Sequence, residues 1–235
     1  MKGLLYKEFY LFRFNLLFIF IIQLIVSALC IPLTIIEADD NTLMIVMLFC
    51  HCIPFSCAAM LNGDFFKHDE KSSWFSFVTS SPQALKGQLQ SKYYALLLLH
   101  LAILFFCFII DCIVVAMSGN MAVSALLPCV LIFCFRTIIN AIEIPFMIRF
   151  GSSSGMYVKG VIFGILIFII AVYGLFGDIS FFMENDPLDA ILDFFKNGGA
   201  IWIISLIPYV AMILYYISYK VSLRLYIKGA EAYEQ

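Results

Sequence analysis

The stretch Tyr93–Met117, YYALLLLHLAILFFCFIIDCIVVAM, decides the fold that we expect for this chain. Its one charged residue is Asp111. The hydrocarbon core of a bilayer is about 30 Å thick and needs ~20 apolar residues of helix to cross it. Because no water is present there to satisfy the backbone, a single segment of this kind must be helical. The stretch therefore predicts a helix that crosses a membrane.

Five further apolar runs have a similar length. The chain is 63% hydrophobic and 13% charged, whereas a soluble domain is nearer half apolar and a quarter charged. No run alternates as barrel strands do, so we expect an all-α membrane protein with six transmembrane helices in one domain, residues 1–235. The first run is too long for a cleavable signal peptide and lacks a small-residue cleavage site. The five runs are Phe14–Ile36, Leu43–Leu61, Ala122–Ile148, Gly160–Phe176 and Ala200–Tyr219.

The basic residues orient these helices. With the N-terminus in the cytoplasm, twelve of the 14 Lys and Arg residues fall in inner segments, and the outer loops hold only Lys196. This bias predicts a multi-pass protein of the bacterial cytoplasmic membrane with both termini in the cytoplasm. The net charge of −2 hides the asymmetry and points to no nucleic-acid partner. The twelve inner residues are Lys2, Lys7, Arg13, Lys67, Lys71, Lys86, Lys92, Arg149, Lys159, Lys220, Arg224 and Lys228.

Three segments lie outside the runs and have features of their own. Residues 1–13 favour a short helix on the inner membrane surface over a simple extension of the first transmembrane helix, because apolar side chains share one face. The outer segment 177–199 has a helix start at Asp186–Pro187 and predicts a short amphipathic helix. The inner loop Arg149–Lys159 contains GSSSG and is expected to be flexible. The apolar positions of segment 177–199 are Leu188, Ile191, Leu192 and Phe195.

The polar stretch Asp69–Tyr94, DEKSSWFSFVTSSPQALKGQLQSKYY, separates the second and third runs. Ser72 or Ser73 can begin a short helix there, and Pro82 follows its end. A helix of two turns does not hold itself together in water, so it needs a membrane surface or a partner. Aromatic side chains beside charged ones are typical of a protein–protein contact. The candidate contact residues are Asp69, Glu70, Lys71, Trp74, Phe77 and Val78.

Polar residues inside the spans are few, and charged ones are costly there unless compensated. Arg136, Asn140 and Glu143 share one face of the helix at 122–148, and His100 of the preceding helix falls at a similar depth. We call these four residues the polar stripe. One interpretation makes the stripe part of a substrate path or a conformational lock; the other makes it a network that holds the two helices together. Asp111 lies about 12 Å from Arg136 in depth, so we expect no direct pair.

The eight cysteines all lie within predicted helices, so no disulfide framework is expected. Cys50-His51-Cys52 resembles a fragment of a metal site, but adjacent residues on a helix face different ways and the spacing is not that of zinc ligands. We therefore expect no metal and no cofactor in this chain. Gly160 and Gly164 form a G-x-x-x-G motif that permits close helix contact. No phosphate-binding loop, H-E-x-x-H or G-x-S-x-G motif occurs, so a catalytic role is not expected.

Five short motifs occur along the chain in a fixed order: MKGLLYKEFY (1–10), DEKSSW (69–74), SSP (80–82), SKYY (91–94) and YKVSLRLYIKG (219–229). Their order and spacing resemble those of the ABC-2 type permeases, the membrane subunits of ATP-binding-cassette exporters. The resemblance spans nearly the whole chain and is strongest toward small bacterial permeases that export amphipathic peptides of the phenol-soluble modulin type. Ser73 and Gln83 stand where the family usually has Gly and a basic residue.

The resemblance implies a mechanism. Asp69–Ser81 would be a coupling helix that docks on a separate ATPase subunit, and residues 1–13 an interfacial connecting helix. Two ATPase copies, which bind ATP and Mg²⁺, would join two permeases, a second copy or a paralogue. The first and fifth transmembrane helices would face the second permease. Two alternatives remain open: a peptide-immunity or scaffold protein that works without ATP, and an intramembrane enzyme with Asp111 or His100 as base.

Overall fold

The computed structural model describes residues 2–35, 40–71, 82–119, 124–176 and 199–233, and every regular element in these ranges is an α-helix. The all-α expectation is therefore confirmed for the described part of the chain. The helices are α1 (Lys2–Leu11), α2 (Arg13–Ile35), α3 (Asp40–Lys71), α5 (Pro82–Ser118), α6 (Leu126–Phe150), α7 (Ser154–Phe176) and α10 (Gly199–Tyr233).

Within the described residues, five helical segments are long and apolar enough to cross a membrane. A sixth span is present if α1 and α2, which meet at an angle of 64°, are counted together. The expected number of six lies at the upper end of this range. The five segments are Ile45–Lys67, Leu85–Ser118, Leu126–Phe150, Ser154–Tyr173 and Ser205–Lys228.

Two helices run well beyond the apolar edges that the sequence suggested. α3 continues past Leu61 to Lys71, and α5 begins at Pro82 rather than at Tyr93. α5 has 37 residues, which makes it about 55 Å long at the rise of an α-helix. The extensions are held by packing, because Phe65 of α3 and Leu89 of α5 are buried. Hydrophobic burial against neighbouring helices thus carries both helices beyond the thickness of a bilayer.

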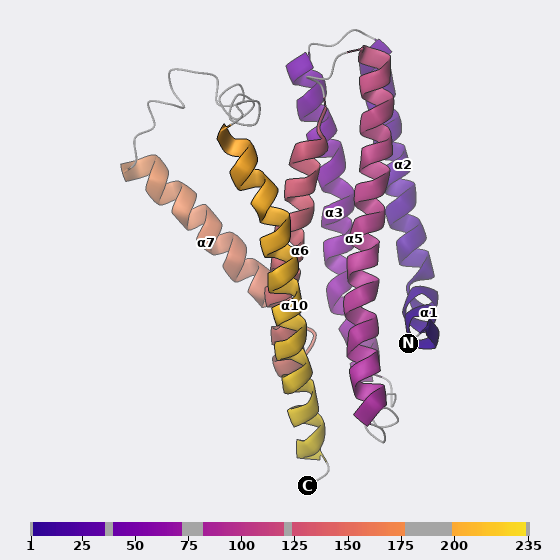
Figure 1. Cartoon of the computed structure of the whole chain (residues 1–235), viewed down its shortest axis with the longest axis vertical. Helices are drawn as coiled ribbons and strands as arrows, with labels where there is room; N and C mark the ends of the chain where they lie inside the picture. Colours follow the sequence, from indigo (N-terminus) through magenta and orange to yellow (C-terminus); the bar gives the residue numbers. More distant parts are fainter. Residues whose placement is uncertain (1, 36–39, 72–81, 120–123, 177–198, 234–235) are drawn as a thin grey trace.

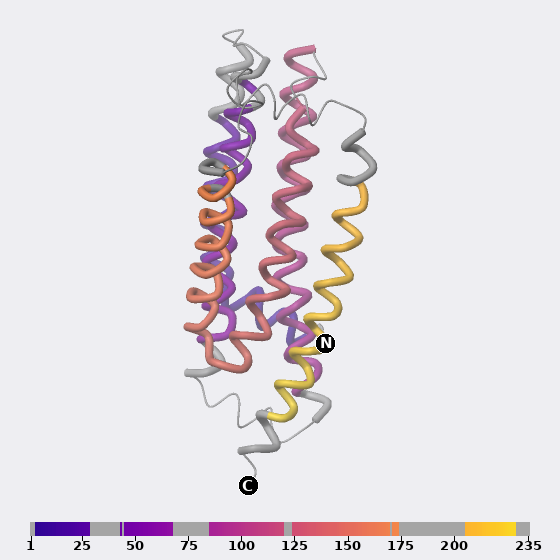
Figure 2. Tube along the Cα trace, turned by 90° about the vertical axis from the view of Figure 1, so that its left-hand side faces the viewer, coloured from indigo at the N-terminus to yellow at the C-terminus, as the bar shows by residue number. Residues whose placement is uncertain are grey.

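The bundle is organised around α6, which packs against α3, α5, α7 and α10. Figure 1 shows α2, α3 and α5 side by side, with α10 crossing in front of α6 and α7 diverging from the rest. Figure 2 shows most helices running along the long axis of the molecule. α1 and the C-terminal part of α10 lie toward the same end of the bundle. Buried side chains of the main core include Phe55, Leu96, Ile103, Phe133 and Ile144.

The connection between α6 and α7 is a tight turn rather than a flexible loop. Gly151 has φ 88°, a conformation that glycine adopts without strain. Ser154 then starts α7, and its Oγ donates to the Gly151 carbonyl at 2.7 Å. The expected flexible loop Arg149–Lys159 is therefore corrected, because GSSSG contributes a turn and the first residues of a helix. This places Lys159 inside α7, next to α6.

Candidate functional site

A buried carboxylate, Glu143 of α6, is the centre of the polar groups inside the bundle. Its side chain is 0% exposed, and two cations approach it. Lys159 Nζ lies 2.9 Å from Oε1, and Arg136 Nη2 lies 3.6 Å from Oε2. Asn62 Nδ2 of α3 donates to Glu143 Oε2 at 3.0 Å and to Asn140 Oδ1 at 2.7 Å. This network joins α3, α6 and α7.

The network holds more positive than negative charge. Arg136 and Lys159 face the single carboxylate of Glu143, and both also donate to the Ala59 carbonyl, at 3.2 Å and 2.7 Å. Arg136 Nε is buried and has no hydrogen-bond partner among the described residues. Coulomb attraction is strong where the local dielectric constant is low. The site is therefore suited to an anionic group that would balance the excess charge.

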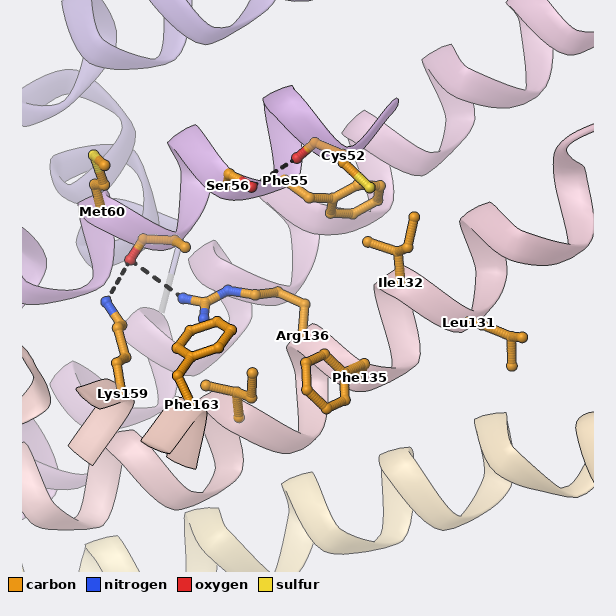
Figure 3. Close-up of a pocket in the computed structure, with 12 residues that line it drawn as sticks. Cys52, Phe55, Ser56, Met60, Leu131, Ile132, Phe135, Arg136, Lys159 and Phe163 are labelled. Atoms are coloured by element: carbon orange, nitrogen blue, oxygen red, sulfur yellow. Dashed lines mark hydrogen bonds between the residues drawn. The ribbon is translucent and has the colours of Figure 1, made fainter. Parts of the chain in front are cut away.

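A cavity of about 620 Å³ adjoins these two cations (Figure 3). The volume falls within the range of about 300–1,000 Å³ that is usual for ligand sites. Apolar and aromatic side chains of α3, α6 and α7 form most of its wall, so the cavity suits an amphiphile with one anionic group. Its lining residues are Cys52, Phe55, Ser56, Ala59, Met60, Leu131, Ile132, Phe135, Arg136, Ile139, Lys159 and Phe163.

The structure joins three residues of the polar stripe through one network of hydrogen bonds and ion pairs, and the hydrogen bond of His100 goes to its own helix. His100 Nδ1 donates to the Leu96 carbonyl of its own helix at 2.6 Å. The His100 ring stacks on the Phe55 ring with their centroids 6.3 Å apart. In the described part of the chain it makes no hydrogen bond to the rest of the stripe. The hydrogen bonds and ion pairs of the stripe join α6 to α3 and α7, whereas the link to α5 in the second interpretation has only the electrostatic interaction of His100 with Arg136. The reason is that Asn62 and Lys159 supply the partners.

Sequence reasoning missed these two partners. Asn62 directly follows the apolar run that ends at Leu61, and Lys159 was counted in an inner loop. A polar residue at the edge of a span is usually solvated, so the sequence held no strong signal for either. A prediction that α3 continues through Asn62 and that α7 already includes Lys159 would have placed both side chains on helices beside α6.

The motif Ser91–Tyr94 forms a junction between helices. Buried Lys92 of α5 donates to the Phe65 carbonyl of α3 and lies 3.7 Å from Glu8 Oε2 of α1. The Phe12 ring stacks on Phe65 with centroids 4.1 Å apart. Lys92 thus fastens both the start of the chain and the end region of α3 to α5.

The next residue of the motif fastens α10. Tyr93 Oη hydrogen-bonds with Ser218 Oγ at 2.8 Å and with Ser222 Oγ at 2.7 Å. Tyr215 Oη donates to the Tyr93 carbonyl at 2.8 Å. Two adjacent residues of α5 therefore contact α1, α3 and α10, and no pattern in the sequence indicated these roles.

Asp111 has a structural role at the start of α6. Its Oδ1 accepts the N–H of Ala125 at 2.6 Å, and its Oδ2 accepts the Ser124 hydroxyl at 2.7 Å. A carboxylate at the N-terminus of a helix satisfies a free backbone donor and interacts favourably with the helix dipole. These bonds involve both carboxylate oxygens and tie Asp111 to the start of α6. As expected, Asp111 and Arg136 have separate partners.

The candidate coupling residues are divided between two parts of the chain. Asp69, Glu70 and Lys71 form the last residues of α3, so they continue a long helix. Trp74, Phe77 and Val78 lie outside the described residues, and their predicted role stays a prediction.

The other predicted segments fall as follows. Residues 1–13 contain α1, which is separate from α2 and lies at an angle to it, while its place at a membrane surface stays a prediction. Residues 177–198 lie outside the described part of the chain.

Gly160 and Gly164 are exposed on α7, and no described atom outside α7 itself lies within 4 Å of a Cβ placed there. A close helix contact at this motif would therefore need a partner other than the described helices of this chain.

A helical bundle with five or six candidate spans and charged groups buried between helices defines a multi-pass membrane protein. The family model described as ABC-2 family transporter protein matches residues 3–227, so the chain belongs to the ABC-2 transporter family. It is the membrane permease component of such a transporter, a domain that carries no ATPase. No curated protein and no solved structure matches the chain. This match identifies the family, and it does not distinguish the peptide exporters from other members.

Proposed function

We propose that this chain is the permease subunit of an ATP-driven exporter that moves amphipathic peptides out of a bacterial cell. The observation that carries the proposal is the cavity between α3, α6 and α7. A peptide would place apolar side chains against Phe55 and Phe163, and a carboxylate near Arg136 and Lys159. Family membership supports ATP as the energy source.

The proposed mechanism uses α3 as a rigid connection. The cavity wall contributed by Cys52–Met60 and the residues Asp69–Lys71 belong to the same helix. A displacement of the following segment by an ATPase subunit would therefore move one wall of the cavity. Lys92 would pass part of this displacement to α5 and α1. ATP must favour one of the two arrangements by differential binding, since a ligand shifts an equilibrium only in that way.

The partners follow from this mechanism. Two ATPase subunits, each binding ATP and Mg²⁺, would act on two permease chains, with both termini of each chain in the cytoplasm. Asp69–Ser81 would dock on the ATPase, with Trp74 as the aromatic anchor. Aromatic anchors in well-packed pockets dominate such interfaces.

The test of the cargo is peptide-stimulated ATP hydrolysis and transport in vesicles that contain the permease and its ATPase. Lys159→Met should weaken stimulation by peptides that carry free carboxylates by about tenfold, as expected for the loss of one charge-assisted contact. Provided that Lys159→Met keeps the melting temperature of the wild type, amidated peptides should stimulate ATP hydrolysis equally in the two proteins. Lys86→Met removes an exposed cation of α5 and is the control. Equal loss for both kinds of peptide, or peptide binding without any change in ATP hydrolysis, would contradict the proposal; the latter fits a peptide-immunity protein.

The test of the coupling segment is co-purification of the ATPase with Trp74→Ala. We expect loss of the complex, with the melting temperature of the permease alone unchanged. Full recovery of the ATPase with this variant would remove the coupling role of residues 69–81.

A further inference from the structure

Three metal-ligating side chains from three different helices meet inside the bundle, and none of them lines the cavity or belongs to the Glu143 network. They are His51 of α3, Cys107 of α5 and Cys129 of α6, and one ligand atom of each lies within 4.8 Å of the others. The side chains are almost fully buried, with exposed fractions of 2%, 1% and 1%. Cys50 and Cys52, the sequence neighbours of His51, do not belong to this group. Tertiary packing has supplied two other cysteines in their place.

One ring nitrogen of the histidine is left unsatisfied although the Cys107 side chain lies beside the ring. His51 Nε2 is buried and has no hydrogen-bond partner among the described residues. A buried polar atom without a partner costs free energy. A metal ion is one group that would compensate, because neutral imidazole is a common metal ligand.

A neighbouring amide supports one of the sulfur atoms. Gln23 Nε2 of α2 donates to the Ile103 carbonyl at 3.2 Å and to Cys107 Sγ at 3.3 Å. An N–H donor stabilises a thiolate more than a thiol, because hydrogen bonds to charged acceptors are stronger. Such bonds around metal ligands orient them and raise metal affinity. A fourth helix therefore takes part in the arrangement.

We propose that His51, Cys107 and Cys129 bind a thiophilic metal ion, Zn²⁺ or Cu⁺. Two sulfur ligands and an imidazole select such ions over Mg²⁺ or Ca²⁺, which prefer oxygen. As each metal–sulfur bond forms, a thiol releases its proton to the solvent. Zn²⁺ with two thiolates and neutral imidazole has no net charge, whereas Cu⁺ with the same ligands leaves one negative charge. Charge balance in an apolar interior favours Zn²⁺, and the low number of protein ligands suits Cu⁺.

The bound ion would cross-link α3, α5 and α6, because each of these helices supplies one ligand. Cys107 lies one helical turn before Asp111 on α5, and Cys129 lies one turn after Ala125 on α6. The metal would therefore lie one helical turn deeper in the bundle than the hydrogen bond between Asp111 and Ala125. Both features hold α5 to the beginning of α6. Metal binding to the native state alone stabilises that state by mass action. The ion would therefore restrict movement between the helices that the transport mechanism must rearrange.

Metal uptake by the purified, reduced full-length chain tests the proposal. The protein is incubated with Zn²⁺ or with Cu⁺, washed with a weak chelator, and the bound metal is measured by mass spectrometry. We expect about one ion per chain for at least one of the two metals, and the retained metal identifies the ion. X-ray absorption should then show sulfur at about 2.3 Å and nitrogen at about 2.0–2.1 Å if the ion is zinc.

Matched variants distinguish this site from uptake by other cysteines. Cys107→Ser and Cys129→Ser should lose the retained ion, while Cys50→Ser and the exposed Cys112→Ser should keep it. Gln23→Leu should weaken metal binding by about 10–100-fold, the usual effect of losing a supporting hydrogen bond. Helical content by circular dichroism verifies that each variant is folded.

Three outcomes would overturn the proposal. These are retention of less than about a tenth of an ion per chain by the wild type, equal retention by Cys50→Ser and Cys107→Ser, or a Cys107–Cys129 disulfide in freshly isolated metal-free protein. None of these measurements uses ATP or peptide, so the result does not depend on the proposed transport function.

Discussion

At the scale of single residues, Glu143 decides how the charges inside the bundle are tolerated. It is the one acidic group within 4 Å of Arg136 and Lys159 in the described part of the chain. Removing one partner of a buried ion pair leaves the other charge uncompensated, which is more damaging than never having had the pair. We therefore expect this carboxylate to be important for folding as well as for any ligand.

Glu143→Gln should lower the stability of the purified permease by about 3–5 kcal/mol, since two cations lose their counter-charge. Thermal unfolding in detergent measures the effect. Asp64→Asn is the control, because Asp64 is an exposed acid on α3. Equal melting temperatures for the two variants would show that the network contributes little.

Gly155 is a second residue whose environment makes a sharp prediction. A Cβ at this position would lie 2.8 Å from Glu143 Oε1 and 2.9 Å from Met147 Sδ. Gly155→Ala should therefore destabilise the protein by about 1–3 kcal/mol, the usual range for overpacking. Gly160→Ala, which meets open space in the described part of the chain, should instead raise the stability by about 0.5–1 kcal/mol, because alanine favours a helix more than glycine does. A more stable Gly155→Ala would mean that helix propensity outweighs the close contact.

At the scale of helices, the Tyr93 hydroxyl makes two of the hydrogen bonds that attach α10 to α5. Tyr93→Phe removes the bonds to Ser218 and Ser222 and leaves two buried hydroxyls without this partner. Each lost hydrogen bond should cost about 1 kcal/mol. Hydrogen–deuterium exchange should increase in the part of α10 around these serines. Tyr94→Phe, at an exposed neighbouring position, should leave exchange as in the wild type; an equal increase would contradict the assignment.

The junction of α1 with α5 can be tested by a double-mutant cycle. Lys92→Met leaves Glu8 buried without its cation from α5, and Glu8→Gln leaves Lys92 without its carboxylate. The double variant should be less unstable than the sum of the two, with a coupling energy of about 0.5–3 kcal/mol. Urea or thermal unfolding of the four proteins gives this energy. Strict additivity would show that the two side chains act independently.

At the scale of the whole molecule, α7 has the smallest buried share among the candidate spans of the described residues. It diverges from the bundle (Figure 1) and carries the exposed Gly160 and Gly164. Exposed apolar side chains are ordinary in lipid, but small residues spaced four apart are typical of helix–helix contacts in membranes. A second permease chain that packs along α7 agrees with the arrangement that the family resemblance implies.

Gly164→Trp should therefore shift the permease from dimer toward monomer, because a large side chain would hold the two helices apart. Native mass spectrometry in mild detergent measures the distribution. Ile213→Trp introduces the same side chain on an exposed face of α10 and should have no effect. A dimer that persists in Gly164→Trp would place the contact on another helix.

Much of this architecture follows from local sequence. Apolar runs predict spanning helices because a backbone in lipid must form its own hydrogen bonds. Their edges were less predictable: the extension of α3 to Lys71 depends on burial of Phe65 against other helices, which periodicity within one segment does not reveal. The same limit applies to the polar stripe. Its members on α6 were found from helical spacing, whereas Asn62 and Lys159 became partners only through packing.

By itself, the sequence determined that this protein is helical, that it lies in a membrane and that its motifs are those of ABC-2 permeases, because these properties depend on composition and on order along the chain. Tertiary structure alone decided which distant side chains meet. Glu143 with Lys159, Lys92 with Glu8, and His51 with Cys107 and Cys129 are pairings between helices. Their geometry depends on how the helices pack against each other, and no spacing along one chain segment encodes it.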